Sequence, residues 1–389
     1  MLNILFIHQS AELYGSDKTL LLLLKNLNKS QFNATVVLPF DGPLKEELEL
    51  AGVKVVIAPV LKLYRKMMSP KGLIGFLSDI KKAYKILNKL RKETPPDIIY
   101  SNTLAVLLGI FYARKTKIKH LWHVHEIIES PKIFTKTFKK LLAQKQNTRI
   151  VYNSYATRNF WSQAATKDKE LVIWNGIETP KVLLPFEEVE HIKQQTFQAD
   201  KTDIIIALVG RISRWKGQQV LLEAFEELTK EFQNIKLVFI GSPPPNQEGF
   251  QMQLEEKIAE KKLQDKVTLI SFTKDIEALW QSIDIAVVPS IEPEPFGLVA
   301  VEAMLAKKPV IASNHGGVAE IVVHNQSGFL VKPNDADDLK QAIKKLILDE
   351  DLREKMGETG YQVALQNFSI ESYVKNFENL FQEIKGTKN

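Results

Sequence analysis

Short runs of β-branched and other apolar residues alternate with amphipathic stretches along almost the whole chain of 389 residues. The strands predicted in the first half span 4–8, 35–39, 54–58, 98–102, 121–125 and 150–154, with helical stretches such as 17–27 and 103–115 between them. Strands that are apolar throughout and alternate with helices are typical of a parallel sheet covered on both faces. The alternation therefore predicts a doubly wound α/β domain.

The alternation pauses between residues 178 and 202, where Pro180, Pro185 and mixed charges show no clear period. We interpret this segment as a connection between domains. The strands predicted beyond it span 203–210, 236–241, 267–272, 285–290, 309–314 and 328–331, and the helices about 216–229, 251–263, 297–306, 335–349, 351–366 and 370–385. The sequence thus predicts two Rossmann-like doubly wound parallel-sheet domains, at 1–177 and 203–368. A C-terminal helix within 369–389 is expected to pack back towards the first domain.

Composition excludes several classes of protein. The chain is 44% hydrophobic and 25% charged and has no cysteine, so disulfides, Cys-ligated metals and thiol catalysis are excluded. No basic segment followed by an apolar stretch opens the chain, and we therefore expect a cytoplasmic protein. No G-x-G-x-x-G, P-loop or G-x-S-x-G motif follows a predicted strand, which argues against dinucleotide oxidoreductases, P-loop enzymes and serine hydrolases.

The net charge of +6 hides a division between the two halves. Residues 1–175 carry 28 Lys and Arg against 13 Asp and Glu, and the segment 61–92 alone carries ten basic residues against Asp79. Nucleic acid and an anionic membrane are the usual partners of such a surface, and Met67 and Met68 beside the lysines favour a membrane. For the apolar stripe of 73–90 itself, a core-facing helix with a solvated lysine face is the simpler interpretation.

The most informative segment runs from Pro289 to Ala303. It predicts a strand end, a proline-rich loop with two acids, and a helix that opens near Gly297. The free N–H groups of such a helix start form a phosphate site. Glu302, about one turn inside the helix, could accept hydrogen bonds from a diol such as ribose, and Glu294 could face a second polyol. The alternative is that Glu294 caps the helix and Glu302 is merely solvated.

Three other segments also follow predicted strands. Arg211 and Lys216, in the loop from Gly210 to Gly217, are well placed to neutralise a diphosphate, although both could be ordinary solvated charges. His123 and His125 share a strand face, where they could pack or, less simply, bind a metal. The remaining segment is Tyr14-Gly15-Ser16-Asp17, where Gly15 permits close backbone approach and Ser16 or Asp17 can cap a helix. Asp335-Ala336-Asp337 has the spacing of a metal-diphosphate motif, but N-capping is the better interpretation.

These residues resemble a known family. Glu294 and Glu302, two acids separated by seven residues around Pro-Phe-Gly-Leu-Val, resemble the E-x7-E signature of family 4 glycosyltransferases, which are retaining group 1 enzymes of the two-Rossmann GT-B fold. Further similarity lies in Gly210-Arg211 with Lys216-Gly217, Asn175-Gly176-Ile177, 314–320 and 328–331. The chain departs from the family pattern at Ser16, where glycine is common, and at Trp174, where proline is common. The resemblance covers nearly the whole chain.

The resemblance implies a role for each matching residue. Arg211 and Lys216, with Gly210, would bind the donor diphosphate, and Glu302 would bind the ribose. Glu294 would hold the donor sugar together with the backbone amides of Phe296, Gly297, Leu298 and Val299. From the first domain, His125 would lie beside the donor sugar, and Gly15 and Ser16 would approach the donor or acceptor. The catalytic group would comprise Glu294, His125, Arg211 and Lys216.

The implied reaction moves a hexose from a nucleotide sugar, such as a UDP- or GDP-sugar, to a hydroxyl acceptor in a cleft between the domains. Because Arg211, Lys216 and a helix start can stabilise the leaving diphosphate, we expect no metal and no other cofactor. The expected acceptor is an envelope glycan or lipid-linked sugar, with the basic first domain on the inner membrane surface and no nucleic acid partner. A nucleotide-sugar epimerase, a phosphorylase or a nonenzymatic glycan-binding protein are the alternatives.

Overall fold

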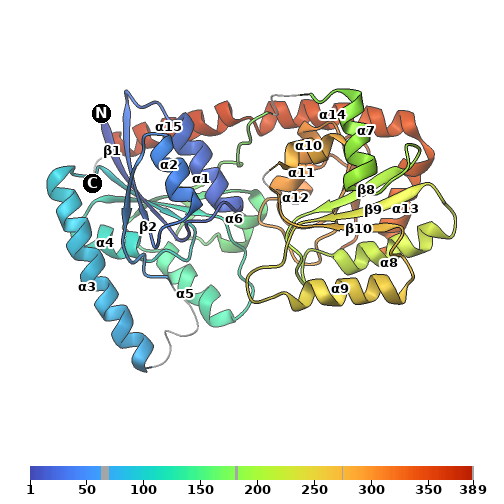
Figure 1. Cartoon of the computed structure of the whole chain (residues 1–389). Helices are drawn as coiled ribbons and strands as arrows, with labels where there is room; N and C mark the ends of the chain where they lie inside the picture. The colour runs from blue at the N-terminus through green and yellow to red at the C-terminus, as the bar shows by residue number, and fades with distance from the viewer. Residues whose placement is uncertain (63–69, 180–182, 274, 388–389) are drawn as a thin grey trace. The chain divides into compact units, whose positions relative to one another are not determined.

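The computed structural model describes residues 1–62, 70–179, 183–273 and 275–387. The chain divides into two compact units (Figure 1). Unit 1 comprises Met1–Glu178 together with Ile370–Asn389, and unit 2 comprises Thr179–Ser369. The C-terminal segment therefore belongs to the same unit as the N-terminus. The segment 178–202 enters unit 2, where it contributes the helix α7 (Phe186–His191) and the π-helical turn η3 (Ile192–Thr196).

Unit 1 is built on a parallel sheet of seven strands in the order β3-β2-β1-β4-β5-β6-β7. The strands are β1 (Leu2–His8), β2 (Phe32–Leu38), β3 (Lys54–Ile57), β4 (Ile98–Asn102), β5 (Lys119–Val124), β6 (Asn147–Tyr152) and β7 (Glu170–Val172). The helices are α1 (Gly15–Asn26), α2 (Pro43–Leu50), α3 (Pro70–Glu93), α4 (Leu108–Thr116), α5 (Lys132–Leu142), α6 (Tyr155–Trp161) and α15 (Ile370–Gly386), with the 3-10 turn η2 (Lys167–Lys169). The sequence had shown no sign of β7, because three residues are too short to display a period.

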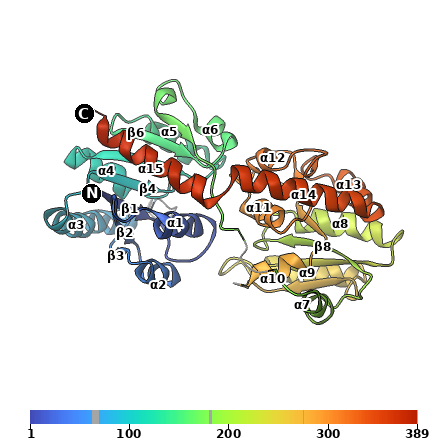
Figure 2. The ribbon, with the colours of Figure 1, turned by 90° about the horizontal axis from the view of Figure 1, so that it is seen from above.

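Both faces of this sheet are buried, which explains why its strands are apolar throughout. In β1, Ile4 and Phe6 enter a core shared with α1, α2 and α15, whereas Leu5 and Ile7 enter a core shared with α3, α4 and α5. Helix α15 lies on the first of these faces, beside α1 (Figure 2). Its Phe381 is fully buried and packs edge-on against the ring of Phe6.

Unit 2 is built on a parallel sheet of six strands in the order β10-β9-β8-β11-β12-β13. The strands are β8 (Ile204–Val209), β9 (Ile235–Ile240), β10 (Val267–Ile270), β11 (Ile285–Val288), β12 (Val310–Ser313) and β13 (Gly328–Val331). The helices after α7 are α8 (Gln218–Thr229), α9 (Gly249–Glu260), α10 (Ile276–Gln281), α11 (Leu298–Leu305), α12 (Val318–Ile321), α13 (Ala336–Leu348) and α14 (Glu350–Asn367). The predicted fold class, two Rossmann-like parallel-sheet domains, is confirmed.

Each sheet has one point where the order of its strands reverses. In unit 1 this point lies between β1 and β4, and in unit 2 it lies between β8 and β11. In doubly wound folds the loops beyond the carboxyl ends of these strands leave a crevice in which ligands bind. We therefore expect site residues in the loops that follow β1, β4, β8 and β11.

Candidate active site

The loop from Gly210 to Gly217 connects β8 to α8 beside the reversal point of unit 2. Both end residues are glycines with positive φ, 147° at Gly210 and 81° at Gly217. A Cβ atom on Gly217 would lie 2.0 Å from the carbonyl oxygen of Pro289, so only glycine fits there. The N–H of Ile291 donates to the carbonyl oxygen of Trp215 at 2.8 Å. These contacts hold the loop against the segment that follows β11.

Lys216 and Glu294 come from these two loops and form an ion pair, with Nζ and Oε1 2.5 Å apart. Their side chains are only 14% and 7% exposed. The Ser290 hydroxyl donates to the same carboxylate oxygen at 2.5 Å, and the Lys216 ammonium lies 4.6 Å from the ring centroid of Trp215. A carboxylate this buried requires such partners, because desolvation of an unpaired charge is costly. The structure thus brings together two residues that the sequence singled out separately.

The backbone on both sides of Glu294 is also fixed. Its carbonyl oxygen accepts a hydrogen bond from the Gly317 N–H at 2.6 Å, and a Cβ atom on Gly316 would lie 2.4 Å from the same oxygen. Helix α11 then begins after Gly297, whose φ of 113° favours glycine. A Cβ on Gly297 would lie 3.0 Å from that of Val318. The two glycines at 316 and 317 are therefore needed because the loop after β12 packs directly on the loop that carries Glu294.

The remaining predicted residues of unit 2 lie on the same two segments of the chain as this pair. Phe296 is buried, with its ring packed against that of Phe368 at 5.7 Å. Leu298 and Val299 form the half-buried first turn of α11, and Glu302 lies half-buried within this helix. Arg211 is exposed at the start of the Gly210–Gly217 loop, and its carbonyl oxygen accepts a hydrogen bond from the Gln218 side chain at 2.9 Å.

In unit 1, His125 belongs to a chain of buried polar side chains. Its Nε2 lies 2.9 Å from Oδ1 of Asn102, whose Nδ2 lies 2.9 Å from Nδ1 of His8. The His8 Nε2 is 2.5 Å from a carboxylate oxygen of Asp17. His8 and Asn102 are paired at the ends of β1 and β4, and His125 follows β5. This series of hydrogen-bonded side chains therefore crosses the carboxyl end of the sheet at the point where the strand order reverses.

His123 in β5 and His125 directly after it lie against one another, with their ring centroids 3.9 Å apart. Burial lowers the pKa of His125 to about 3. Burial also holds the pKa of His123 well below its usual value. The His123 Nδ1 lies 2.5 Å from the hydroxyl of Tyr100. Both imidazoles are therefore uncharged at neutral pH.

Gly15, which is exposed, and Ser16, which is half-buried, begin the first turn of α1. Asp17 accepts a hydrogen bond from the backbone N–H of Tyr14 at 2.9 Å, and so helps to cap α1 as the sequence suggested. Its other oxygen faces His8. The Ser16 carbonyl oxygen accepts a hydrogen bond from the Asn102 side chain at 3.2 Å. Ser16 and His125 therefore share one neighbour, Asn102.

Sequence reasoning missed His8 and Asn102 and gave Asp17 only a capping role. A signal for them was present, because the strands predicted at 4–8 and 98–102 end at His8 and Asn102. Strand order was needed to use it, and the residues after β1, β4 and β5 become neighbours only once β1 pairs with β4.

Glu126 is a further titratable group next to His125. Its carboxylate accepts hydrogen bonds from the backbone N–H groups of Leu104 at 3.0 Å and of His125 at 3.1 Å. Burial raises the pKa of Glu126 from 4.5 to about 7, although these hydrogen bonds oppose the shift. The carboxylate thus joins the segment after β4 to the segment after β5.

Glu126→Gln is expected to unfold at a higher temperature than the wild type at pH 8, whereas the two should coincide near pH 4.5. The folded protein binds the Glu126 proton more tightly than the unfolded chain, so this group lowers stability as pH rises from 4.5 through 7. The glutamine oxygen can still accept both backbone hydrogen bonds without the charge. We expect a difference on the order of 1–3 kcal/mol above pH 8. Thermal unfolding from pH 4.5 to 8.5 measures it, and a difference that does not change with pH would contradict this account.

The Asp335-Ala336-Asp337 segment opens α13. The Asp335 side chain accepts a hydrogen bond from the Asp338 N–H at 2.9 Å, so the interpretation as an N-cap is confirmed. Asp337 pairs with Lys340. Within residues 1–62, 70–179, 183–273 and 275–387, no three His, Cys, Asp or Glu side chains are grouped so that they could hold a metal ion.

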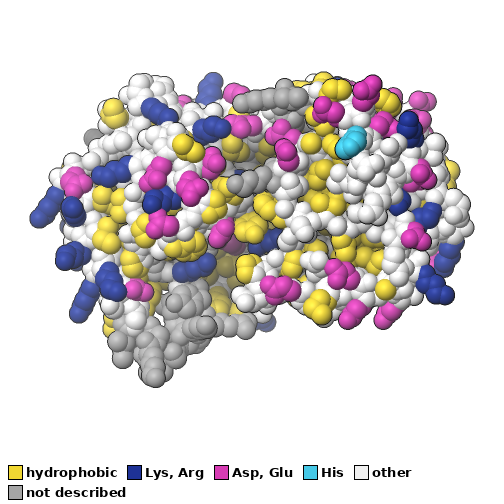
Figure 3. Space-filling view, in the orientation of Figure 1, with side chains coloured by type: hydrophobic (Ala, Val, Ile, Leu, Met, Phe, Trp, Pro, Cys, Tyr) yellow, Lys and Arg dark blue, Asp and Glu magenta, His cyan; other side chains and the backbone are white. Residues whose placement is uncertain are grey.

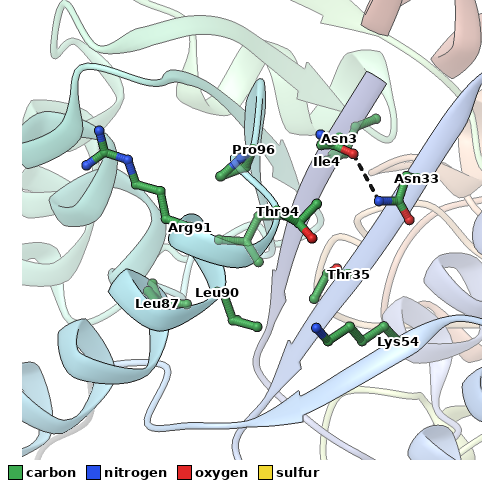
Figure 4. A pocket seen from close by; sticks show the side chains of 11 residues that line it. Asn3, Ile4, Asn33, Thr35, Lys54, Leu87, Leu90, Arg91, Thr94 and Pro96 are labelled. Carbon is green, nitrogen blue, oxygen red and sulfur yellow. Dashed lines mark hydrogen bonds between the residues drawn. The ribbon is translucent and has the colours of Figure 1, made fainter. Parts of the chain in front are cut away.

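A narrow pocket lies in unit 1 between the C-terminal half of α3 and the strands β1 and β2 (Figure 4). Asn3 and Asn33 are hydrogen-bonded beside it at 2.9 Å. Its free volume is about 20 Å³, enough for little more than one water molecule. The pocket lies towards the amino-terminal end of β1, opposite to His8, and contains none of the predicted site residues.

Two family models match the chain. The model described as "Glycosyltransferase Family 4" matches residues 14–181, and the model described as "Glycosyl transferases group 1" matches residues 189–363. The two matches adjoin one another and together span most of both units. The chain belongs to the family 4, group 1 glycosyltransferases. The family resemblance of the Glu294 to Glu302 segment is thereby confirmed.

Relatives of this glycosyltransferase support the assignment over most of its length. The capsular polysaccharide biosynthesis glycosyltransferase CapM of Staphylococcus aureus is 26% identical over 324 residues, which are 79% of this chain and 82% of CapM. The lipopolysaccharide 1,2-N-acetylglucosaminetransferase of Salmonella typhimurium is 24% identical over 82% of this chain and 80% of its own. The structure of Anabaena Alr3699/HepE in complex with UDP-glucose has a TM-score of 0.83 and 25% identity, covering 98% of this chain and 100% of that one.

Proposed function

We propose that this glycosyltransferase transfers a hexose from a nucleoside diphosphate sugar to a hydroxyl group of a glycan or lipid-linked acceptor, with retention of the anomeric configuration. The buried pair of Lys216 and Glu294 carries the proposal, because it sets a cation and a carboxylate 2.5 Å apart next to a helix start. The similarity to a protein that binds UDP-glucose favours a uridine nucleotide as the first donor to test. The capsular and lipopolysaccharide transferases among the relatives favour an envelope glycan as product.

Negative charge develops on the leaving diphosphate while the sugar acquires oxocarbenium character, so fixed positive groups there stabilise the transition state. We assign this role to Lys216 and Arg211, together with the backbone N–H groups of Gly297, Leu298 and Val299 where α11 begins. Glu302 binds the ribose, and Glu294 orients Lys216 and the donor sugar. With these groups at the diphosphate, the proposed reaction requires no metal ion.

Retention follows if the acceptor attacks the face that the diphosphate leaves. The departing phosphate oxygen then takes the proton from the acceptor hydroxyl, so the reaction requires no side chain as a general base. The new bond joins the acceptor oxygen to the anomeric carbon, and the bond from that carbon to the diphosphate oxygen breaks. The resemblance to the family assigns His125 to the donor sugar, and its imidazole is uncharged.

A donor screen tests this proposal. The protein is incubated with UDP-, GDP- and ADP-sugars, with and without a mixture of envelope glycolipids, and release of nucleoside diphosphate is measured. We expect one donor to be consumed, and NMR of the product should show the anomeric configuration of that donor. Inversion would overturn the retaining mechanism. Conversion of the nucleotide sugar into an isomer without release of nucleotide would identify an epimerase instead.

The acceptor side of the proposal depends on α3. Lys81, Lys82, Lys85 and Lys89 are exposed on this helix, and basic side chains gather along the left edge of Figure 3, over unit 1. Of its apolar positions, Leu87 is buried in the core, Ile80 and Leu90 pack against the core partly buried, and Leu77 is exposed. Met67 and Met68 lie outside the described residues. No helix among the described residues is long and apolar enough to span a bilayer. We therefore propose peripheral binding to an anionic membrane, driven mainly by charge.

Reversing the charge of the four exposed lysines of α3 to glutamate is expected to abolish co-sedimentation with phosphatidylglycerol vesicles. Each lysine near an anionic surface contributes about 1 kcal/mol, and the attraction decays within about 10 Å at 0.1 M salt. Binding should therefore weaken as salt is added, while hydrolysis of the donor, whose proposed site lies in unit 2, changes little. The matched control reverses four exposed lysines of unit 2, namely Lys201, Lys262, Lys345 and Lys355. Equal binding of the wild type to neutral and anionic vesicles would contradict the proposal.

A further inference from the structure

We propose that Asn102 is a positioning residue that fixes the proton of His125 on Nε2 and leaves Nδ1 as a hydrogen-bond acceptor. Nδ1 would then accept a hydrogen bond from a hydroxyl group of the bound sugar, and this last step rests on the proposed function. The observations that carry the proposal are the hydrogen bonds of Asn102 to His8, Ser16 and His125, which together use every polar hydrogen and the oxygen of its amide.

The orientation of the Asn102 amide is determined by its partners. The Ser16 carbonyl oxygen, 3.2 Å away, can only accept, so the NH₂ group must face it. The same NH₂ group lies 2.9 Å from Nδ1 of His8. Because the NH₂ group donates, this nitrogen accepts, and the other ring nitrogen of His8, Nε2, faces the carboxylate of Asp17 at 2.5 Å. The contact with the Ser16 carbonyl oxygen therefore fixes the orientation of the amide, and the contact with His8 is compatible with it.

This orientation places Oδ1 of Asn102 2.9 Å from Nε2 of His125. An amide oxygen only accepts, so Nε2 of His125 must carry hydrogen. His125 is 8% exposed, and its pKa of about 3 leaves one ring proton at neutral pH. Nδ1 of His125 therefore carries a lone pair and no hydrogen. The series of hydrogen bonds that begins at the Asp17 carboxylate thus sets the tautomer of His125.

The backbone around Asn102 is held in a conformation that supports this role. Thr103, the next residue, is fully buried and has a φ of 83°, which is strained for a β-branched residue. Its N–H donates to the carbonyl oxygen of His123 at 2.8 Å, and its own carbonyl oxygen accepts from the Trp122 indole at 2.8 Å. The strain is maintained by these contacts with β5. The end of β4 is thus fixed relative to the strand that leads into His125.

The experiment is NMR of the intact protein with ¹⁵N- and ¹³C-labelled histidine at pH 7.5, which distinguishes a protonated ring nitrogen from one with a lone pair. His125 is assigned from the signals that disappear in His125→Gln. We expect the wild type to show hydrogen on Nε2 and a lone pair on Nδ1. A proton on Nδ1 of His125 in the wild type would overturn the proposal. This measurement needs no substrate, so its outcome is independent of whether the proposed transfer reaction is correct.

Variants at position 102 distinguish an effect on the tautomer of His125 from an effect on the fold. Asn102→Leu removes the acceptor, and the His125 signals should shift towards a mixture of tautomers, whereas Asn102→Asp keeps an acceptor oxygen and should keep hydrogen on Nε2. The matched control is Asn147→Leu, because Asn147 bonds Nδ1 of the buried His120 at 2.7 Å, at the opposite end of β5. It should leave the His125 signals unchanged. An unaltered His125 tautomer in folded Asn102→Leu would overturn the positioning role.

Activity gives a second readout once a donor is known. Asn102→Leu should reduce transfer about 10- to 100-fold, the loss seen when a group that orients a metal-binding histidine is removed. Asn102→Asp should retain more activity than Asn102→Leu, although a loss of Ser16 contacts is also expected. Equal transfer by Asn102→Leu and Asn147→Leu, at temperatures well below unfolding, would contradict the role of the tautomer in transfer.

Discussion

Glu294→Gln is expected to reduce sugar transfer about 100- to 1000-fold while the protein remains folded, an effect comparable to the loss of one strong electrostatic group. The glutamine oxygen can still accept hydrogen bonds from Ser290 and from Lys216, so the buried loop keeps its partners. The charge that orients Lys216 is lost. Initial transfer rates measure the effect, and circular dichroism checks the fold.

A control for Glu294 lies two residues away. Glu292 is exposed on the same loop and pairs with Arg214, so Glu292→Gln tests the loss of an acid without the loss of the buried pair. We expect it to transfer sugar at close to the wild-type rate. Glu302→Ala should instead mainly weaken nucleotide binding. Transfer at the wild-type rate by Glu294→Gln would refute the assignment of this segment as the donor site.

Lys216→Ala is expected to cost about 3 kcal/mol of transition-state stabilisation, which is a rate loss of more than 100-fold. The substitution removes the ammonium that is proposed to face the leaving diphosphate, and Glu294 is left as a buried carboxylate without its cation. Rates should therefore be compared well below the unfolding temperature, because removing one partner of a buried pair also destabilises the fold. Arg214→Ala, on the same loop but exposed, is the matched control.

Two further measurements sharpen this prediction. The double variant Lys216→Ala/Glu294→Gln should lose less activity than the product of the two single losses, because the two residues are in direct contact. Wild-type activity should persist in excess EDTA, since Lys216 and Arg211 are proposed to take the place of a metal ion. If EDTA abolished transfer and Mg²⁺ or Mn²⁺ restored it, the metal-free mechanism would be wrong.

Much of the fold could be predicted because strands buried on both faces have a strong sequence signal. The run 204–209 and the run 285–288 are apolar throughout, and each is followed by a glycine- or proline-rich loop. The N-cap at Asp335 could be predicted for a similar reason, since capping depends on the residues immediately around it. Features governed by near neighbours in the chain were therefore predictable.

Short or irregular features could not be predicted from the sequence. The strand β7 has three residues, and α7 lies in a segment without clear periodicity. The positive φ of Thr103 could not be expected from a β-branched residue, because it is imposed by hydrogen bonds to His123 and Trp122. Such contacts join residues that are distant in the chain, and no local preference encodes them.

The amino-acid sequence by itself determined the class of fold, the family and which charged residues lie in the two loops proposed to bind the donor, since these follow from apolar periodicity and from motifs of a few adjacent residues. Only the tertiary structure decided that Lys216 and Glu294 form one buried pair and that Asp17, His8, Asn102 and His125 form one chain. The physical reason is that strand order brings loops from distant segments to one edge of a sheet. Burial then makes each polar group depend on the partner it finds there.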